Sequence, residues 1–584
     1  MTASGWAQIG LYVLVLLALV RPLGAYMARV YEGRRTFLHP VLAPLEQAIY
    51  RLAGVRADDE MPWHAYAGAL LAFSVLSTLA VYLLLRVQGY LPLNPRGFAG
   101  VPPFISFNTA SSYATNTDWQ AYGGETTLSY LTQMLGLTVQ NFCSAAAGMA
   151  VLVALIRGLT RHTAQSIGSF WVDLTRGTLY ILLPLSLVLA LLLVSQGVVQ
   201  TLGDYRVVPL WHPEGPAGGV TPVQQVLALG PAASQIAIKQ LGSNGGGFFN
   251  ANSAHPFENP TPLSNFLEAL AMPLIPAALC YTYGVMVRDT RQGWAVLAAM
   301  VAVFVVLLGV CAWSEGRGNP ILTSAGVSQA ASGLQPGGNM EGKEVRFGIA
   351  GSALWATVTT AVSNGSVNSM LDSFTPLGGL MPMWLMQLGE VIFGGTGSGL
   401  YGMLAFVIVA VFVAGLMVGR TPEYLGKKIE AFEIKMAALM VLIPPALVLC
   451  SSALAMATTA GQAAAFNRGP HGYSEILYAV SSMGNNNGSA FAGLNVSAPL
   501  YTLVGGAVML CARFIPAISA LAIAGSLARK QVIPASAGTL PTHTPLFVAW
   551  LIAVVVIVGA LSFIPALALG PIAEQLLMVR GATF

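Results

Sequence analysis

Long apolar runs separated by short polar segments recur from one end of the chain to the other. A helix needs roughly 20 residues to cross a hydrocarbon core of about 30 Å. Ten runs are long enough, one of them interrupted, and they cover residues 5–28, 63–90, 126–157, 169–198, 262–287, 293–314, 377–418 (interrupted), 429–456, 498–527 and 541–567. The pattern therefore predicts an all-α membrane protein with about ten transmembrane helices.

Four further apolar segments are too short to cross a membrane, because about a dozen helical residues rise only about 18 Å. They lie between pairs of long runs, at residues 102–114, 231–242, 350–362 and 472–484. Each is followed at once by a short polar stretch and then by another long run. We therefore expect four half-length helices that enter from the outer side, each ending in a loop within the membrane.

The four polar stretches share a common spacing. Aligning Asn116, Asn244, Asn364 and Asn487 gives intervals of 128, 120 and 123 residues, which fits a repeated unit of span, pore helix, filter loop and span. All four units have the same orientation. The predicted divisions are an N-terminal span with a cytoplasmic loop at 1–62, pore repeats at 63–160, 161–290, 291–425 and 426–530, and a C-terminal span at 531–584.

Loops of this kind suit a cation. Irregular backbone at membrane depth is tolerated only where it is buried in protein or lines a watery cavity, so the four loops should share one axis. Their carbonyl oxygens can then replace the hydration shell of an ion. Gly245, Gly365 and Gly488 allow the backbone to turn, and the helix C-termini add partial negative charge. No ring of Asp or Glu occupies the aligned positions, which favours a monovalent ion, above all potassium, over a divalent one.

Composition agrees with a membrane protein, since 9% of residues are charged and 55% hydrophobic. Alternating the spans from an outside N-terminus places about twice as many Lys and Arg on one face as on the other, which predicts a cytoplasmic face there and both termini outside. The five cysteines lie in apolar segments without paired spacing, which disfavours a disulfide framework or a zinc site. The seven histidines are scattered, which disfavours a membrane enzyme.

The third repeat contains a break in its second span, the glycine-rich stretch Phe393–Gly399, with Glu390 just before it. Glycines have little helix propensity, so a non-helical plug below the loops is reasonable, and close helix packing through small residues is the alternative. Residues 397–402 match G-x-G-x-x-G formally, but they lie in an apolar helix and follow no strand. Neither a Walker A sequence nor the Asp-Lys-Thr-Gly motif of a P-type pump occurs.

Three polar stretches carry a resemblance to a known family: 243–260, 419–428 and 485–493. The chain resembles the potassium-transporter superfamily, and within it the potassium-binding A subunits of bacterial Kdp potassium-transporting ATPases. The resemblance implies that the potassium filter consists of Thr115, Asn116, Thr117, Ser243, Asn244, Gly245, Ser363, Asn364, Gly365, Asn486, Asn487 and Gly488. In this alignment Thr117 stands where the other loops have glycine.

The surroundings of the filter are predicted from the same sources. The resemblance places Gln120 at the filter rim. Asp118 and Asp372 follow the loops in the sequence, which places them at the outer mouth. The resemblance also implies a gating loop in the broken span, formed by Glu390, Gly394, Gly395, Gly397 and Gly399. Glu390 and Arg513 are intramembrane charges that suit either a polar internal path or structural pairing.

The function that the resemblance implies is potassium uptake without catalysis by this chain. It would select potassium outside the bacterial inner membrane and pass it to a separate P-type ATPase chain, the B subunit of a complex that also contains small C and F subunits. Bound potassium is the expected ligand and membrane lipid the expected surroundings, with no covalent cofactor and no nucleic acid. The alternative is a stand-alone potassium channel or symporter of the same superfamily.

Overall fold

The computed structural model describes residues 2–209, 224–333, 335–534 and 539–581, so parts of the predicted second repeat and C-terminal segment lie outside the described residues. Within these ranges, ten helical segments are long and apolar enough to cross a membrane, as predicted. They are α1 (Ala3–Tyr31), α3 (Trp63–Val87) with η1 (Gln88–Tyr90), η2 (Thr132–Thr138) with α6 (Val139–Thr160), α7 (Phe170–Arg176) with η3 (Gly177–Leu182) and α8 (Leu183–Ser195), α10 (Pro262–Met286), α11 (Thr290–Gly316) with α12 (Pro320–Ser324), α15 (Ser398–Met417), α16 (Ala431–Ala457), α19 (Pro499–Arg529) and α20 (Pro545–Leu569).

The four predicted half-length helices are also present in the described chain. They are α4 (Pro103–Ala114), α9 (Ala232–Leu241), α13 (Gly348–Ala361) and α18 (Gly469–Gly484). Proline in the first turn of α4 and of α18 suits a helix start, because the missing N–H has no intrahelical partner there. All four helices are buried along most of their length, so protein surrounds them.

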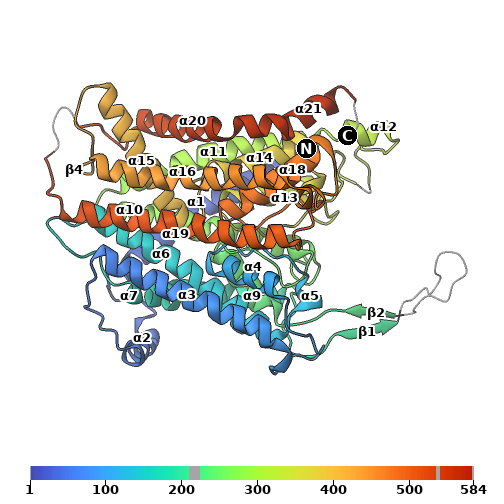
Figure 1. Ribbon diagram of the computed structural model, residues 1–584, viewed down its shortest axis with the longest axis horizontal. Helices are drawn as coiled ribbons and strands as arrows, with labels where there is room; N and C mark the ends of the chain where they lie inside the picture. Colours follow the sequence, from blue (N-terminus) through green and yellow to red (C-terminus); the bar gives the residue numbers. More distant parts are fainter. Residues whose placement is uncertain (1, 210–223, 334, 535–538, 582–584) are drawn as a thin grey trace, which may run out of the picture.

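The remaining elements are shorter than the spans, and most of them lie in the connections between these helices. An antiparallel hairpin of β1 and β2 projects from one end of the molecule, while α2 lies near the opposite end (Figure 1). The start of α1 and the C-terminal α21 lie at the hairpin end, so both ends of the chain are on one side (Figure 1). These elements are α2 (His39–Ala53), α5 (Gly124–Thr127), β1 (Arg206–Pro209), β2 (Gln224–Leu227), η4 (Asn252–Ala254), η5 (Leu371–Ser373), α14 (Pro376–Gln387), β3 (Glu423–Tyr424), β4 (Lys427–Lys428), α17 (Thr459–Gln462) and α21 (Pro571–Val579).

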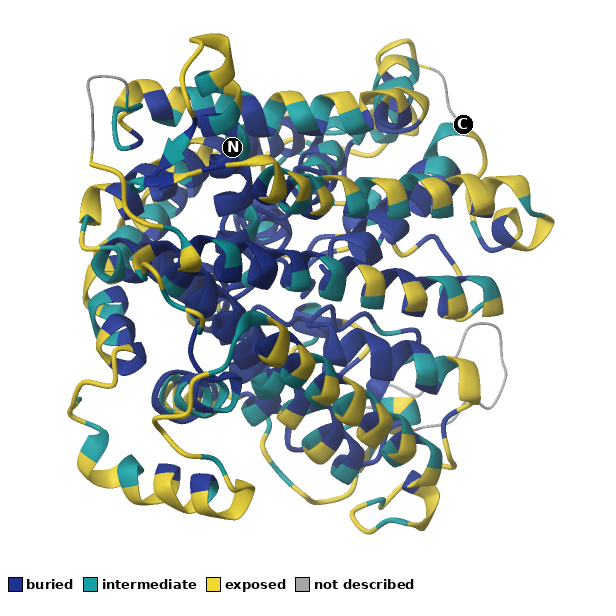
Figure 2. Ribbon diagram, turned by 60° about the vertical axis from the view of Figure 1, so that its left-hand side comes forward, coloured by how far each residue is buried: buried dark blue, intermediate teal, exposed yellow. Residues whose placement is uncertain are grey.

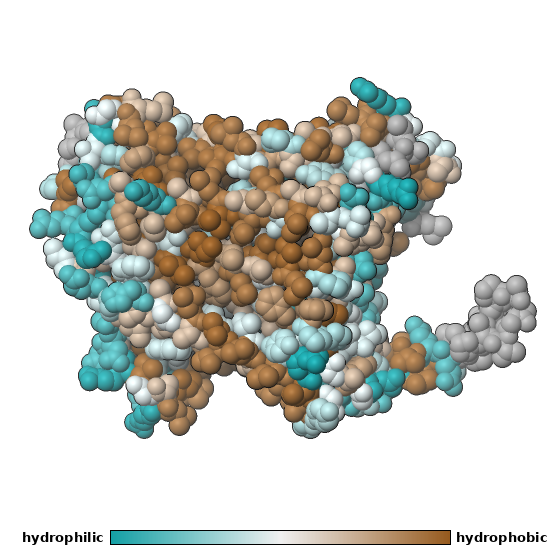
Figure 3. All heavy atoms as spheres, viewed as in Figure 1, coloured by the Kyte–Doolittle hydropathy of each residue, from teal (hydrophilic) through white to brown (hydrophobic). Residues whose placement is uncertain are grey.

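The buried core follows the centre of the helix bundle, and the outer helices face lipid. In Figure 2 the central segments are buried and the peripheral ones alternate between buried and exposed. In an apolar stretch of 18 residues in the span that contains α6, 83% of the residues are buried, against 22% in the corresponding stretch of the span that contains α3. Large apolar side chains such as Leu187 and Leu561 are exposed on the spanning helices. Figure 3 shows a hydrophobic belt across the middle of one face, with hydrophilic residues toward both ends. Such a belt is the surface that a bilayer covers.

The predicted break in the third repeat is real. Helix α14 ends at Gln387 and α15 begins at Ser398, and residues 388–397 between them are not helical. Backbone dihedrals with positive φ at Gly389, Glu390, Phe393, Gly394 and Gly397 keep this segment from continuing either helix. The segment is buried, which is the one setting in which irregular backbone is tolerated at membrane depth.

Candidate cation-binding site

The loops that follow α4, α9, α13 and α18 lie side by side in the interior, as the sequence pattern predicted. The first and second loops are joined by the Asn116 amide, whose Nδ2 donates to the Ser243 carbonyl oxygen (2.7 Å) and whose Oδ1 accepts from Asn244 Nδ2 (2.7 Å). The fourth and first are joined by Asn486 Nδ2, which donates to Thr117 Oγ1 (2.9 Å).

The remaining two junctions use asparagine as well. Asn364 Nδ2 donates to the carbonyl oxygen of Lys239, in the last turn of α9 (2.9 Å), which joins the third loop to the second. Asn487 Nδ2 donates in the same way to the carbonyl oxygen of Thr359, in the last turn of α13 (3.0 Å), which joins the fourth loop to the third. Since each loop contacts the next and the fourth contacts the first, the four loops form a closed ring.

The backbone of each loop repeats one conformation. Two residues separated by one position have positive φ, a combination that is rare outside glycine. The pairs are Asn116 and Asp118 (62° and 52°), Ser243 and Gly245 (50° and 84°), Ser363 and Gly365 (56° and 87°), and Asn486 and Gly488 (56° and 103°). The loops are thus related by their backbone path as well as by their sequence.

This backbone path corrects the sequence alignment of the first loop by one residue. Asp118, and not Thr117, takes the place of the three glycines. The backbone N–H of Thr117 donates to the carbonyl oxygen five residues earlier, as do those of Asn244, Asn364 and Asn487 (2.8–3.0 Å). The alignment was wrong because it matched asparagine side chains, whereas the repeat is one of backbone conformation. Aspartate fits because its short polar side chain tolerates the left-handed region.

The glycines of the ring fit against carbonyl groups of the adjacent loop. A Cβ atom at Gly245 would overlap the carbonyl oxygen of Asn364. One at Gly365 would overlap that of Asn487, and one at Gly488 that of Thr117. Equivalent carbonyl groups in three loops therefore lie against the glycine of the adjacent loop. Backbone carbonyl oxygens at such a ring of loops are ligands that can replace the hydration shell of an alkali ion.

The charge at the ring comes from the ends of the half-length helices. Each of the four helices ends immediately before its loop, at Ala114, Leu241, Ala361 and Gly484. A helix C-terminus carries a partial negative charge of about half a unit. Of the twelve predicted filter residues none is ionisable, and Asp118 beside them is buried (1% exposed). The ring thus offers neutral oxygen ligands in a moderately negative field.

Gln120 lies next to the ring and links two loops. Its Nε2 donates to the carbonyl oxygen of Gly247 (2.9 Å), and its Oε1 accepts from the N–H of Gly247 (2.8 Å). Gln120 Nε2 also contacts the hydroxyl groups of Tyr113 (3.1 Å) and Tyr122 (3.2 Å). The Gln120 side chain therefore holds the segments that follow the first and second loops at a fixed separation.

Asp372 lies farther along the chain after the third loop, where it pairs with His471 of α18 (3.3 Å). Glu574 of α21 contacts the other ring nitrogen of His471 (2.9 Å). Burial alone would lower the pKa of His471, but the hydrogen bonds and charges of Asp372 and Glu574 outweigh it and raise the pKa to about 10. Asp372 thus belongs to a separate cluster of side chains at the start of α18.

The non-helical segment 388–397 packs directly against the ring. Thr396 Oγ1 contacts Ser243 Oγ (2.9 Å), and the N–H of Gly394 donates to the carbonyl oxygen of Ala361 at the end of α13 (2.8 Å). A Cβ at Gly397 would overlap the carbonyl group of Gly148 in α6. The structure thus brings the predicted gating segment into contact with the predicted filter residues.

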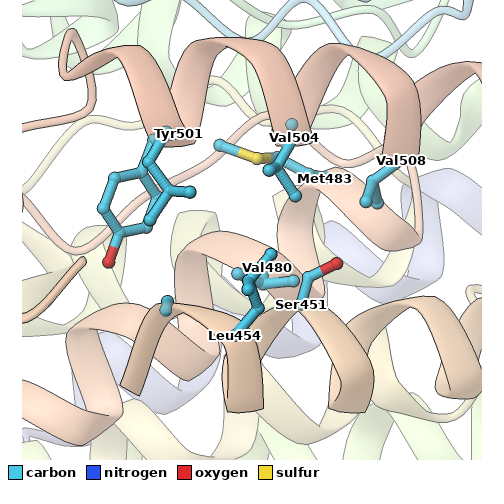
Figure 4. Close-up of a pocket in the computed structure, with 10 residues that line it drawn as sticks. Ser451, Leu454, Val480, Met483, Tyr501, Val504 and Val508 are labelled. Atoms are coloured by element: carbon cyan, nitrogen blue, oxygen red, sulfur yellow. The ribbon is translucent and has the colours of Figure 1, made fainter. Parts of the chain in front are cut away.

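Two hollows beside the ring differ in character. One has a volume of about 60 Å³ and is lined by the predicted filter residues Ser363 and Asn486, among others, and by two charged side chains, Glu390 and Arg513. The other, between α16, α18 and α19, has a volume of about 10 Å³ and is lined mostly by apolar side chains such as Met483 and Val504 (Figure 4). Only the first is polar enough for an ion.

Comparison with known proteins places this architecture in a family. The family model described as potassium-transporting ATPase A subunit matches residues 10–576. The chain belongs to this family. It is 67% identical to the potassium-transporting ATPase potassium-binding subunit of Sorangium cellulosum and 63% identical to that of Methylococcus capsulatus, over 99% of this chain and 100% of each relative.

A solved structure supports the fold of this A-subunit family member. The potassium transporter TrkH from Vibrio parahaemolyticus matches 86% of this chain and 95% of its own, with a TM-score of 0.50 and 13% sequence identity. At that identity the likeness concerns the fold alone. It agrees with the helical membrane fold described above.

One element of this A-subunit site was missed by sequence reasoning, a buried ion pair behind the second loop. Lys239, in α9, is fully buried and its Nζ lies 2.5 Å from Glu258 Oε2. The same Nζ donates to the carbonyl oxygen of Gly246 (3.0 Å), which fixes the backbone that leaves the ring. The available signal was a lysine inside an apolar half-length helix, because such a charge needs a partner.

Replacing Glu258 with glutamine should strongly destabilise the protein. The buried Lys239 charge would lose its partner, which typically costs about 3–5 kcal/mol. The measurement is thermal unfolding in detergent. Glu344→Gln, which removes the partner of Arg346 in a partly exposed pair, is the control and should change stability by at most about 1 kcal/mol. Equal stability of both variants would show that the buried pair does not anchor the second loop.

Proposed function

We propose that this chain is the potassium-binding, channel-like subunit of an ATP-driven potassium uptake complex. The observation that carries the proposal is the closed ring of four loops, in which carbonyl groups lie against the adjacent loop and Asp118 is the one ionisable residue among the aligned loop positions. Potassium is the ion that suits such neutral ligands, because its hydration shell is easily replaced by carbonyl oxygens. A divalent ion would call for charged oxygen ligands.

The proposed filter consists of the residues predicted from the sequence, extended by Asp118. The backbone register supports Asn116 to Asp118 as the first-loop counterpart of Ser243 to Gly245, Ser363 to Gly365 and Asn486 to Gly488. Gln120 forms the rim. The segment with Glu390, Gly394, Gly395, Gly397 and Gly399 is the proposed gate, because it contacts the ring and is irregular where a helix would otherwise continue.

The proposed partners are the P-type ATPase chain, which is the B subunit, and the C and F subunits of the same complex. This chain contains neither a Walker A sequence nor the Asp-Lys-Thr-Gly motif, so ATP hydrolysis has to come from another chain. The complex would lie in the bacterial inner membrane, with both termini of this chain and the filter entrance on the extracytoplasmic side. The excess of Lys and Arg on the α2 side supports this orientation.

Gentle purification tests the assignment. The chain should be isolated together with a P-type ATPase subunit, and potassium should stimulate ATP hydrolysis by the purified assembly. A chain that is isolated alone from its native membrane, yet conducts potassium in liposomes, would contradict the subunit function and favour a stand-alone channel or symporter.

Replacing Gln120 with arginine should weaken the apparent affinity for potassium. The variant places a positive charge beside the ring, and it loses the oxygen that accepts from the N–H of Gly247. We expect the potassium concentration for half-maximal ATPase activity to rise by about tenfold, which corresponds to about 1.4 kcal/mol.

Gln120→Leu serves as the matched control, because it removes the same hydrogen bonds without adding charge. If repulsion dominates, the arginine variant should be the weaker of the two, and the difference should shrink as ionic strength rises. Equal affinities of the arginine variant and the unmodified chain at low salt would contradict a position at the filter rim.

A further inference from the structure

The cluster around His471 is set apart from the filter and is strongly acidic. Asp372, Glu475 and Glu574 all form their ion pairs with the one imidazole of His471. Three carboxylates therefore share a single basic side chain among the described residues. All three are largely buried, with side-chain exposures of 10%, 0% and 4%. An excess of buried negative charge is costly unless a cation balances it.

The orientation of the imidazole is that of a metal ligand. Glu574 Oε2 lies 2.9 Å from Nδ1 of His471, so this carboxylate can hold the proton on Nδ1 while a metal ion displaces the proton on Nε2. Nε2 in turn faces Asp372 Oδ1 at 3.3 Å and Glu475 Oε1 at 3.9 Å. Ligand atoms about 2.0–2.1 Å from a tetrahedral zinc ion are separated by about 3.3 Å. The three groups are thus near the required spacing, and their ligand atoms all lie within 4.8 Å of one another.

An oxygen atom without a partner points to the same conclusion. Glu475 Oε2 is buried and has no hydrogen-bond partner among the described residues, although the side chain is fully buried. Its other oxygen accepts from Asn467 Nδ2 (2.5 Å), which orients the carboxylate. A buried carboxylate oxygen without a donor is uncommon, and a bound cation is one explanation for it. The imidazole is 20% exposed, which leaves an entry path from solvent.

We propose that His471, Asp372 and Glu475 bind a divalent transition metal ion of the zinc class. Glu574 is the group that orients His471, and solvent completes the coordination. The mixture of one imidazole and two carboxylates suits zinc and its neighbours better than potassium or magnesium, which prefer oxygen ligands alone.

The position of the site suggests what bound metal would do. His471 and Glu475 lie in the first two turns of α18, whose other end holds the fourth filter loop, and Asp372 follows the third loop in η5. Phe491, which follows the fourth loop, stacks on Tyr478 of α18 (4.2 Å between ring centroids) and faces His471 (6.4 Å). Bound metal would tie the outer segments of the third and fourth repeats together and rigidify them.

Metal binding to the purified full-length complex tests the proposal. Zinc is titrated against a chromophoric chelator after exhaustive removal of metals, and cobalt replaces zinc as a probe, because its d–d absorption reports the coordinating ligands. The unmodified chain should bind one equivalent of zinc and show the absorption of a site with nitrogen and oxygen ligands. His471→Ala should lose this equivalent, and Glu574→Gln should weaken it by about 10–100-fold, as expected for an orienting partner.

His255→Ala is the matched control. His255 also lies in a polar connection and stacks on an aromatic ring, that of Phe249 (4.1 Å), but it belongs to no cluster of potential metal ligands among the described residues. Its replacement should leave zinc binding unchanged. Asp372→Asn and Glu475→Gln preserve side-chain volume and serve if the alanine variant fails to fold. Unchanged zinc binding in these variants, or no zinc equivalent in the unmodified complex, would overturn the proposal.

Discussion

Replacing Gly245 with aspartate should abolish the discrimination between potassium and sodium while leaving the protein folded. The residue has a φ of 84°, and a Cβ would overlap the carbonyl oxygen of Asn364 in the adjacent loop. That oxygen has to move, and the new carboxylate adds a second acidic side chain to the ring, at the position that Asp118 occupies in the first loop. We expect the ratio of potassium to sodium affinity, measured from the stimulation of ATPase activity, to fall by at least about tenfold.

Glycines elsewhere separate the effect of this contact from that of backbone strain. Gly365→Ala and Gly488→Ala should also impair selectivity, because each Cβ would overlap a carbonyl oxygen of the next loop. Gly97 has a similar dihedral (φ 64°) but open space around the Cβ position. Gly97→Ala should therefore cost only about 1–2 kcal/mol of stability and leave selectivity intact. Normal discrimination in the Gly245 variant would contradict the placement of Gly245 in the filter.

The spans and half-length helices could be predicted because their signals are local. Hydropathy and length alone distinguish a run that crosses the membrane from one that cannot. The structure places α4 and α9 within one residue of the predicted bounds 102–114 and 231–242 at each end. The convergence of the loops was also predictable, because irregular backbone has no other stable place in lipid.

The register of the first loop was not predictable from residue identity. Asn116 and Asn244 are the same residue type, yet Asn116 occupies the backbone position of Ser243. Which residue adopts the left-handed conformation depends on hydrogen bonds back to the preceding helix, and these are set by the geometry at its end. Asp118 was assigned to the outer mouth from its position alone, and its equivalence to Gly245 became visible only in three dimensions.

The partners of buried charges were equally out of reach. Lys239 and Glu258 are 19 residues apart, and His471 and Glu574 are 103 residues apart. The sequence shows that such charges need partners, but many carboxylates could serve. The choice depends on how α9, α18 and α21 pack, which is a property of the whole fold.

Replacing Glu390 and replacing Arg513, two charged residues beside the ring, should change the apparent potassium affinity in opposite directions. Glu390 and Arg513 are the two charged side chains among the residues that line the cavity of about 60 Å³. The buried carboxylate of Glu390 has Ser363 and Asn487, two of the predicted filter residues, as polar neighbours, which places it beside the ring. Glu390→Gln leaves the cavity with the guanidinium charge alone, and Arg513→Gln leaves it with the carboxylate alone.

A unit charge at roughly 6 Å in an effective dielectric of about 20 changes the energy of an ion by about 3 kcal/mol. Glu390→Gln should therefore raise the potassium concentration for half-maximal ATPase activity by at least about tenfold, and Arg513→Gln should lower it or trap the ion and slow turnover. Tyr401→Phe, which changes a lining residue without changing charge, should stay within about twofold of the unmodified chain. If both charge variants shifted the potassium concentration for half-maximal activity in the same direction, the two side chains would act through folding. An ion in the cavity should instead respond in opposite directions to the loss of a negative and of a positive charge.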